Sequence, residues 1–385
     1  MVLTIGAVIM YQRIPASTNV ASPSPTPTVR VSTGPLPAIP LILPAGFVVH
    51  VFADGLGSPR DLVESPGGTI LVSDPNAGLV YALPDRNRQG RAVTNKVVIS
   101  DTHRPHGLAF YQGKLYVAEV DRVVRYDWNE VGLTASNPKV LFGLPENHDH
   151  NNRTIAFDRS GKMYVSVGST CNVCREDSPL SATVIVSDAA GRHHQVMATG
   201  LRNAAFIQVN PQTGELWGTE MGRDYLGDDL PPDEINIIRP GQDYGWPYCY
   251  GERVHDDVFD PQSTHSCQAT QIPVDLIPAH SAPLGLVFIQ SSQFPSAWQG
   301  DLLVAYHGSW NRSVPVGYRV VHLKVNKNTI GAVGDFVTGF LPPGATDGPS
   351  AARGRPVDLL FDRAGNLYLS DDKSGSVYII QHPGR

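Results

Sequence analysis

Residues 160–167 read SGKMYVSV, a glycine turn followed by alternating apolar residues, and five other stretches share this pattern: GGTILVSD (67–74), QGKLYVAE (112–119), TGELWGTE (213–220), QGDLLVAY (299–306) and AGNLYLSD (364–371). Glycine at the second position favours a turn, and the alternation after it is the period of a half-buried strand. Another apolar run precedes each copy, and a third follows most of them. Six such repeats predict an all-β fold, a six-bladed β-propeller of four-stranded antiparallel blades, with a β-sandwich as the alternative.

The composition agrees with a globular protein made of short strands. The chain has 385 residues, of which 41% are hydrophobic and 17% are charged. Its high contents of glycine (37) and proline (32) suit many strands joined by turns. A net charge of −6 without a basic stripe argues against a nucleic-acid partner.

The N-terminal segment differs from the rest of the chain. We expect residues 1–18 to be a signal peptide or the remnant of a membrane anchor, because their apolar run is shorter than the roughly 20 residues of a membrane helix. Residues 19–42 are rich in proline, serine and threonine and predict a flexible linker. The propeller is then expected over residues 43–385, and any membrane contact only through the N-terminus.

The four cysteines fall into two local groups, Cys171 with Cys174 and Cys249 with Cys267. The wide second spacing does not suit a zinc site. Two local disulfides are favoured over free thiols, and they indicate an oxidising compartment. The protein is therefore expected to be exported, that is, periplasmic, extracellular or anchored at the cell surface.

Basic residues open the first strand of most repeats. The segments SPRDLV, RPHGLAF, NNRTIAF, LRNAAFI and GRPVDLLF supply Arg60, His106, Arg153, Arg202 and Arg355. Because the first strand of each blade lines the channel of a propeller, symmetry brings these side chains around one axis. Crowded guanidinium groups are costly without negative charge among them. The sequence therefore predicts an anionic ligand with several carboxylates or phosphates on the axis.

The loops between the second and third strands are expected to face the same ligand. The acid-rich stretch 220–234 (EMGRDYLGDDLPPDE) suits a hard divalent cation such as Ca²⁺, although a merely solvated acidic loop explains it nearly as well. Trp310 in HGSWNR is a candidate for stacking on a substrate or cofactor ring.

Several motifs together resemble one family. They are the stretch 147–153 (NHDHNNR), VGSTCN (167–172), GLRN (200–203), RDYLGDDLPP (223–232), YGWPY (244–248), APLGL (282–286), GDLLVAYHGSWNR (300–312) and GRPVDLLFDRAGNLYLSDDKSG (354–375). In this order they resemble the soluble quinoprotein glucose/sorbosone dehydrogenases, in particular the L-sorbosone/pyranose dehydrogenase-like branch. The resemblance implies a six-bladed propeller that binds pyrroloquinoline quinone (PQQ) and Ca²⁺.

The resemblance also implies a reaction and its catalytic residues. An aldose or sorbosone-like sugar would be oxidised by hydride transfer from its anomeric or hydrated-aldehyde carbon to PQQ, giving a lactone or acid, and an external quinone or cytochrome would accept the electrons. His150 matches the family's catalytic base, and Arg202 would stabilise the developing oxyanion. His148 is the rival base, because it lies two residues away and faces the same side of an extended segment.

Cofactor and metal residues are carried over in the same way. Arg202 and Asn203 match the pair at the reactive carbonyls of PQQ, and Arg353 and Arg355 match the paired arginines near its carboxylates. Arg312 stands near the place of a family lysine, and Arg153 belongs to the repeated ring. The backbone carbonyls of Gly222 and Arg223 map to the calcium loop, although Met221 and Gly222 replace the usual Asn-Glu pair of the family there.

Two other functional classes stay open at this point. A calcium-dependent lactonase or esterase also uses acidic propeller loops, but it centres the metal on carboxylates and needs no ring of arginines. A non-catalytic propeller that binds a protein or glycan is the third reading, and the presence of His150, Arg202, Asn203, Arg353 and Arg355 argues against it.

Overall fold

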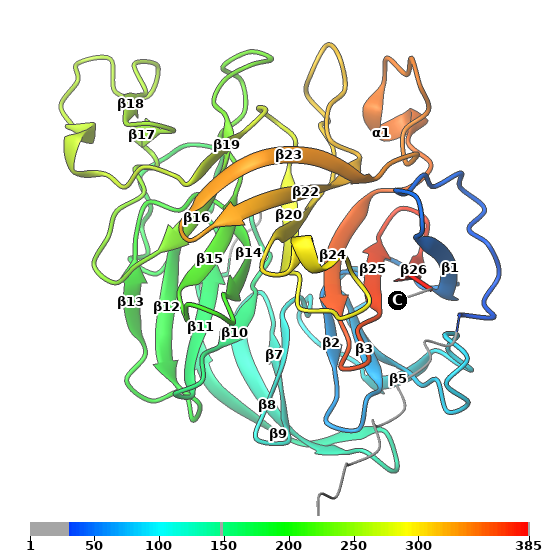
Figure 1. Ribbon diagram of the computed structural model, residues 1–385. Helices are drawn as coiled ribbons and strands as arrows, with labels where there is room; N and C mark the ends of the chain where they lie inside the picture. The colour runs from blue at the N-terminus through cyan, green and yellow to red at the C-terminus, as the bar shows by residue number, and fades with distance from the viewer. Residues whose placement is uncertain (1–30, 147–148, 384–385) are drawn as a thin grey trace, which may run out of the picture.

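Six four-stranded antiparallel sheets form a six-bladed β-propeller (Figure 1), as the sequence predicts. The structure is a computed structural model, which describes residues 31–146 and 149–383. From the inner to the outer strand, the blades are β2 (Leu62–Glu64), β3 (Ile70–Asp74), β4 (Leu79–Leu83) and β5 (Lys96–Ile99); β6 (Leu108–Tyr111), β7 (Lys114–Ala118), β8 (Arg122–Asn129) and β9 (Thr134–Gly143); β10 (Ile155–Phe157), β11 (Lys162–Val167), β12 (Thr183–Asp188) and β13 (Gln195–Ala198); β14 (Ala204–Val209), β15 (Leu216–Glu220), β16 (Asp233–Ile238) and β19 (Asp275–Ile277); β20 (Pro283–Phe288), β21 (Leu302–Tyr306), β22 (Arg319–Asn326) and β23 (Thr329–Val337); and β24 (Pro356–Phe361), β25 (Leu367–Asp371), β26 (Ser376–Gln381) and β1 (Val48–Ala53).

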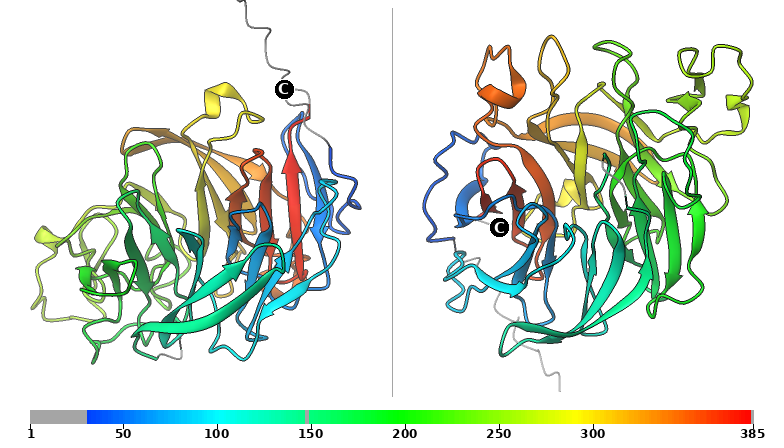
Figure 2. Two further views of the ribbon diagram at one scale, coloured as in Figure 1. Left: turned by 90° about the horizontal axis from the view of Figure 1, so that it is seen from below. Right: turned by 180° about the vertical axis from the view of Figure 1, so that it is seen from behind.

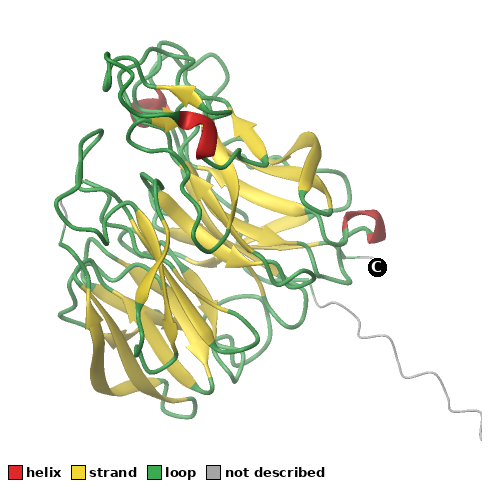
Figure 3. Ribbon diagram, turned by 90° about the vertical axis from the view of Figure 1, so that its left-hand side faces the viewer, coloured by secondary structure: helices red, strands yellow, loops and turns green. Residues whose placement is uncertain are grey.

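The inner strands close a circle. Each inner strand contacts that of the next blade, and β24 of the sixth blade contacts β2 of the first. The second strands carry the repeated motif and are the most deeply buried, because neighbouring blades cover both of their faces; β3, β15, β21 and β25 are buried along their whole length. Helical structure among the described residues is confined to short segments, as Figure 3 shows, and none of them has the length and apolarity needed to cross a membrane.

The repeated glycines make the turns that the sequence predicts. All six adopt the positive φ angles that side-chain-bearing residues rarely tolerate: Gly68, Gly113, Gly161, Gly214, Gly300 and Gly365, between 75° and 92°. Each lies in the hairpin from the inner to the second strand, so the inner strand begins at the opposite face. That face is where the basic residues gather.

The sixth blade joins the two ends of the chain. Its outer strand is the N-terminal β1, which pairs antiparallel with β26 through Val49 opposite Ile380 and Val51 opposite Tyr378. Figure 2 shows these first and last strands side by side. The ring is thus held shut by backbone hydrogen bonds between segments that are distant in sequence.

The folded part begins before Leu43, which corrects the expected end of the linker. Ser32 donates its backbone N–H to Gln381 (2.7 Å) and its hydroxyl to the carbonyl of Gly90 (2.7 Å). Ile39 joins the core of blades five and six, and Ile42 bridges to Thr338. The expected signal peptide or anchor (1–18) and the linker residues 19–30 lie outside the described residues.

Both predicted disulfides are present, Cys171–Cys174 and Cys249–Cys267. The second lies in an insertion of blade four, between β16 and β19, which carries the small hairpin of β17 (Cys249–Tyr250) and β18 (Val254–His255). This insertion stands away from the blades (Figure 1). A short helix, α1 (Gly348–Ala351), lies in the connection from blade five to blade six.

Candidate active site

The ring of basic residues predicted from the repeats exists. Burial is the main cause that lowers the pKa values of three imidazoles, and the arginines at the strand openings lower them further. Arg60 and Arg153 act on His106, Arg202 and Arg153 on His150, and Arg355 and Arg60 on His307. Each arginine influences a histidine of a neighbouring blade, so these side chains surround one axis and create a positive field.

Some of these charges are already compensated within the protein. Arg60 pairs with Asp372 (2.7 Å), Arg202 with Asp224 (3.1 Å) and Arg312 with Asp229 (3.0 Å). An external anion is therefore not needed for Arg60 and Arg202 of the ring, nor for Arg312, which lies outside it. Their carboxylates come from loops that sequence spacing does not place beside them.

Other arginines in the ring lack a carboxylate partner among the described residues. Arg153 donates to the backbone carbonyls of His150 (2.7 Å), Asn152 (2.9 Å) and Pro145 (3.1 Å). It is 0% exposed, so the prediction that it contacts the cofactor is corrected: it fixes the loop that carries His150. The positive charge of Arg153 is therefore balanced only by the dipoles of these backbone carbonyls.

Arg353 and Arg355 precede β24, and their predicted contact with cofactor carboxylates stays a prediction. Arg355 donates to the carbonyls of His307 (3.2 Å) and Gly308 (2.6 Å) and lies 5.6 Å over the ring of Tyr318. Arg353 is exposed. Neither forms an ion pair within the described part of the chain, so the charge of Arg355 in the ring has no carboxylate partner there.

His150 is held in one tautomer. Its Nδ1 lies 2.8 Å from the hydroxyl of Ser169 and 3.2 Å from the carbonyl of Ser169. The Ser169 hydroxyl donates its own hydrogen to the carbonyl of Cys171 (2.8 Å), so both oxygens near Nδ1 act as acceptors. Nδ1 must carry the proton, which leaves the lone pair on Nε2.

Burial, followed by the positive charge of Arg202, lowers the pKa of His150 to about 3. The imidazole is therefore neutral at physiological pH, and Nε2 has no hydrogen-bond partner among the described residues. A neutral imidazole with an unengaged lone pair on Nε2 can accept a proton, as a general base does. The rival base His148 lies outside the described residues.

Asn203 lies beside His150 across Gly168. A Cβ atom on Gly168 would come within 2.5 Å of Cβ of His150 and 3.3 Å of Oδ1 of Asn203. Glycine is therefore required at this position for the two side chains to approach one another. The structure brings together residues from the openings of blades three and four, as predicted.

Arg202 is only 4% exposed and is saturated with acceptors. Its Nε and Nη2 groups donate to Asn172 (2.8 Å each), Nη2 also to Asp224 (3.1 Å), and Nη1 to the carbonyls of Met221 (3.3 Å) and Gly222 (2.9 Å). The guanidinium therefore acts on the site mainly through its charge.

This arrangement bears on the expected calcium site. The Gly222 carbonyl already accepts from Arg202, so a calcium ion there would compete with a guanidinium. Burial raises the pKa of Glu220 well above its usual range and those of Asp233 and Glu234 to about 7. Arg223 uses its own side chain to pair with buried Asp256 (2.8 Å). The Gly222 carbonyl is thus shared with a guanidinium in this structure, and calcium at the Gly222 and Arg223 carbonyls stays a sequence-based prediction.

The acid-rich loop instead joins blade four to blade five. Asp224 accepts from Asn311 (2.6 Å), and Asp228 accepts from the backbone N–H of Ser313 (3.1 Å). Beside this contact stand two exposed aromatic residues, Tyr225 (73%) and Trp310 (57%), with their rings edge to face at 6.1 Å. They form a rim next to the site, of which the sequence indicated Trp310 but not Tyr225.

Sequence reasoning also missed Ser169 and Asn172, which hold His150 and Arg202. VGSTCN contains both, but polar residues in a loop carry no signal of the partner they will meet. A cationic propeller axis with an oriented, neutral histidine defines a class of ligand-binding propellers with acid–base capacity.

Comparison with known proteins identifies the family to which this propeller belongs. The chain belongs to the TrAA12-like family, whose model matches residues 41–383. It is 26% identical to the pyrroloquinoline quinone-dependent pyranose dehydrogenase of Coprinopsis cinerea over 90% of this chain, but it spans only 55% of that relative's length. It is 24% identical to the pyrroloquinoline quinone-dependent sugar dehydrogenase of Hypocrea jecorina, covering 87% of this chain and 88% of the relative.

The fold agrees with a solved structure of the same kind. The holo form of the pyranose dehydrogenase PQQ domain from Coprinopsis cinerea superposes with a TM-score of 0.77 and 24% identity, covering 91% of this chain and all of that one. The resemblance found in the sequence is confirmed, and the relatives are oxidoreductases.

Proposed function

We propose that this protein is a PQQ-dependent sugar dehydrogenase. It would oxidise the anomeric hydroxyl of an aldose, or a sorbosone-like hydrated aldehyde, to a lactone or acid. Family membership and the names of two relatives support this reaction. The observation that carries it is the neutral His150, with its Nε2 lone pair directed away from Ser169 beside a ring of positive charge.

The anionic cofactor would lie beside Arg355, whose charge in the ring has no carboxylate partner among the described residues. Arg353 and Arg355 would hold carboxylates of PQQ, with Asn203 as a hydrogen-bonding partner. When bound, PQQ supplies the two-electron redox chemistry. Arg312 is already paired with Asp229, so its proposed contribution is to fix the blade-five loop near the ligand.

His150 would accept the proton of the sugar hydroxyl at Nε2, while Ser169 keeps the ring in the required tautomer. Arg202 favours negative charge that develops on the substrate oxygen, and it does so by its field because its N–H groups are engaged. Tyr225 and Trp310 would place an apolar rim against the sugar ring.

The proposal also covers the compartment of the enzyme and its electron acceptor. The two disulfides support an exported enzyme, and the electron acceptor would be an external quinone or cytochrome. The alternative of a calcium-dependent lactonase finds less support, because such a site centres its metal on carboxylates and needs no arginines at the propeller axis.

The test is a titration of the apo-protein with PQQ, followed by dye reduction with a panel of aldoses, with and without Ca²⁺. We expect saturable PQQ binding and sugar-dependent bleaching. The double variant Arg353→Met/Arg355→Met should bind PQQ at least about tenfold more weakly, whereas exposed Arg86→Met should not. Lack of PQQ binding by the wild-type protein would refute the proposal.

A further inference from the structure

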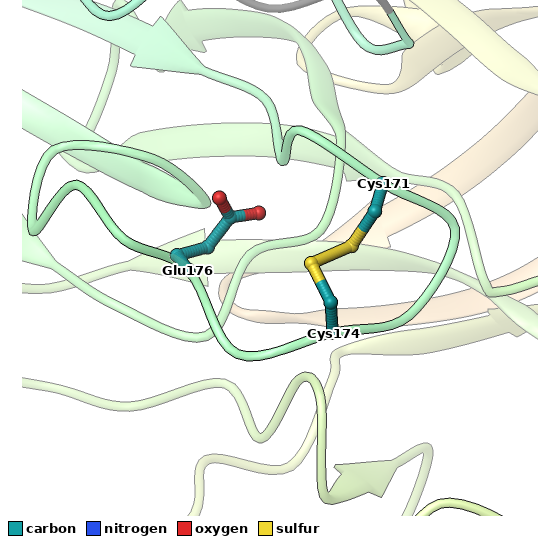
Figure 4. A group of neighbouring side chains, drawn as sticks. All are labelled: Cys171, Cys174 and Glu176. Carbon is teal, nitrogen blue, oxygen red and sulfur yellow. A yellow bond between two sulfur atoms is a disulfide. The ribbon is translucent and has the colours of Figure 1, made fainter.

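The Cys171–Cys174 disulfide closes a small loop between β11 and β12 beside the candidate base. Figure 4 shows this disulfide with Glu176 next to it. The Glu176 carboxylate accepts from the backbone N–H (2.8 Å) and the hydroxyl (2.7 Å) of Thr170, the residue before the first cysteine. The loop is thus fixed both by a covalent bond and by a carboxylate.

Asn172 inside this loop is the main partner of Arg202. Its carbonyl accepts from Nε and its Oδ1 from Nη2 of Arg202, both at 2.8 Å. The same Oδ1 accepts from the backbone N–H of Asp224 (2.8 Å), and Nδ2 donates to the Asp224 carbonyl (3.3 Å). Asn172 therefore fixes the guanidinium and its counter-ion together.

A buried guanidinium depends on such acceptors. Arg202 is nearly enclosed, and a buried charged donor left without an acceptor is costly. Without the Asn172 side chain, Nη2 would keep only Asp224, which itself would lose two contacts to the loop. The guanidinium would then move to find other acceptors or water.

The carbonyl of Cys171, next to Asn172, helps to orient the candidate base His150 through Ser169. The carbonyl of Cys171 accepts the Ser169 hydroxyl hydrogen, and this bond makes Ser169 an acceptor for Nδ1 of His150. Two consecutive carbonyls of the disulfide loop, those of Cys171 and Asn172, thus hold the base and the cationic group of the site. We propose that Asn172 is a positioning residue for Arg202, and that the Cys171–Cys174 disulfide keeps the Cys171 and Asn172 carbonyls in register, so that the site is active only while this disulfide is intact.

The two disulfides differ in access to reductant. Cys171 and Cys174 are half-buried, whereas Cys249 and Cys267 are 4% and 6% exposed. A dithiol reductant such as dithiothreitol would exchange first with Cys171–Cys174: it passes two electrons and two protons to the protein disulfide, giving two cysteine thiols and the cyclic oxidised reagent. Reduction opens the loop without touching the insertion of blade four.

The activity measurement in this test rests on the proposed function. A second measurement, the NMR titration of His150, does not depend on it. In the apo-protein, His150 can be followed by NMR titration, with His150→Gln to assign its signal. Arg202 and Arg153 are the cationic groups that act on His150. If Asn172→Ala releases Arg202, the pKa of His150 should rise, because burial still lowers it but the charge of Arg202 no longer does.

The expected results are as follows. Asn172→Ala lowers kcat by about 10- to 100-fold and raises the His150 pKa, whereas Val173→Ala in the same loop changes neither. Cys171→Ser/Cys174→Ser reproduces the loss of kcat and is insensitive to dithiothreitol, while the wild-type enzyme loses activity as two thiols appear. The inference fails if Asn172→Ala retains wild-type kcat, KM and His150 titration, or if reduction, verified by thiol count, leaves activity unchanged. A wild-type protein without dehydrogenase activity whose His150 pKa still rises in Asn172→Ala would refute the proposed function and leave the positioning role standing.

Discussion

The Nδ1 atom of His150 lies 2.8 Å from the hydroxyl of Ser169, and that hydroxyl donates its hydrogen to the carbonyl of Cys171. This short chain determines which nitrogen of the imidazole is basic. It also ties the loop before β10 to the loop after β11. The orientation of the base is therefore a property of blade three as a unit.

Removal of the imidazole should abolish proton transfer but not cofactor binding. His150→Ala is expected to lower kcat by about 10²–10⁴-fold, the range typical of a lost general base. PQQ affinity should change little, since the arginines remain. Steady-state kinetics with a PQQ titration measure both, and exposed His194→Ala is the control. Wild-type turnover in His150→Ala would exclude this residue as the base.

Gly168 should be intolerant of any side chain. In Gly168→Ala the new methyl group would lie 2.5 Å from Cβ of His150 and 2.6 Å from its carbonyl oxygen, so the base must shift. We expect kcat to fall by about tenfold or more, with PQQ affinity retained. Gly334→Ala is the matched control because its Cβ would meet no atom within 4 Å. Equal kcat values for the two variants would contradict the close approach seen here.

The buried neutral histidine predicts a loss of stability in acid. Burial and Arg202 lower the pKa of His150 to about 3, so between pH 6.5 and 3 the unfolded chain binds a proton that the folded chain does not. Stability is therefore present above pH 6.5 and is lost as the pH falls, by about 1.4 kcal/mol per pH unit for one such group.

His150→Gln should remove this contribution. Urea unfolding at pH 6 and pH 5 should show a smaller loss of unfolding free energy for His150→Gln than for the wild-type protein, by about 1 kcal/mol. Parallel pH dependences would mean that the folded imidazole titrates as freely as the unfolded one.

Calcium binding should be opposed by Arg202 in the absence of cofactor. Because its Nη1 group donates to the carbonyls of Met221 and Gly222, Arg202→Gln should bind Ca²⁺ several-fold more tightly than the wild-type apo-protein, since about 1 kcal/mol corresponds to fivefold. Calorimetric titration with CaCl₂ measures this, and Arg60→Gln serves as the control. Unchanged affinity would show that calcium does not use these carbonyls.

The closure of the sixth blade predicts a sharp difference between two truncations. A chain that begins at Val31 keeps β1 and the contacts of Ser32, and we expect its Tm to equal that of the full chain. A chain that begins at Asp54 lacks β1, which leaves the edge of β26 unpaired, and it should lose at least 10 °C in Tm or fail to fold. Thermal unfolding followed by circular dichroism decides, and equal Tm values would show that β1 is dispensable.

The repeated hairpin determined the architecture from the sequence alone. A glycine turn followed by alternating apolar residues specifies strand position and burial locally, and six copies leave a propeller as the arrangement that buries them all. The basic residues at the strand openings followed from the same symmetry. Arg60, Arg153, Arg202 and Arg355 were placed near one axis in this way, whereas His150, Asn203 and Arg353 were assigned through the family resemblance.

The tertiary structure decided how these charges are used. Asp224 compensates Arg202, Asp372 compensates Arg60, and backbone carbonyls enclose Arg153, because loops of different blades meet at distances that sequence spacing does not encode. Ser169 and Asn172 acquired their roles in the same way. The extent of the fold before Leu43 depended on where Ser32 and Ile39 find partners, which are up to 349 residues away in the chain. Local pattern therefore set the blades, and contacts between loops set the chemistry at their axis.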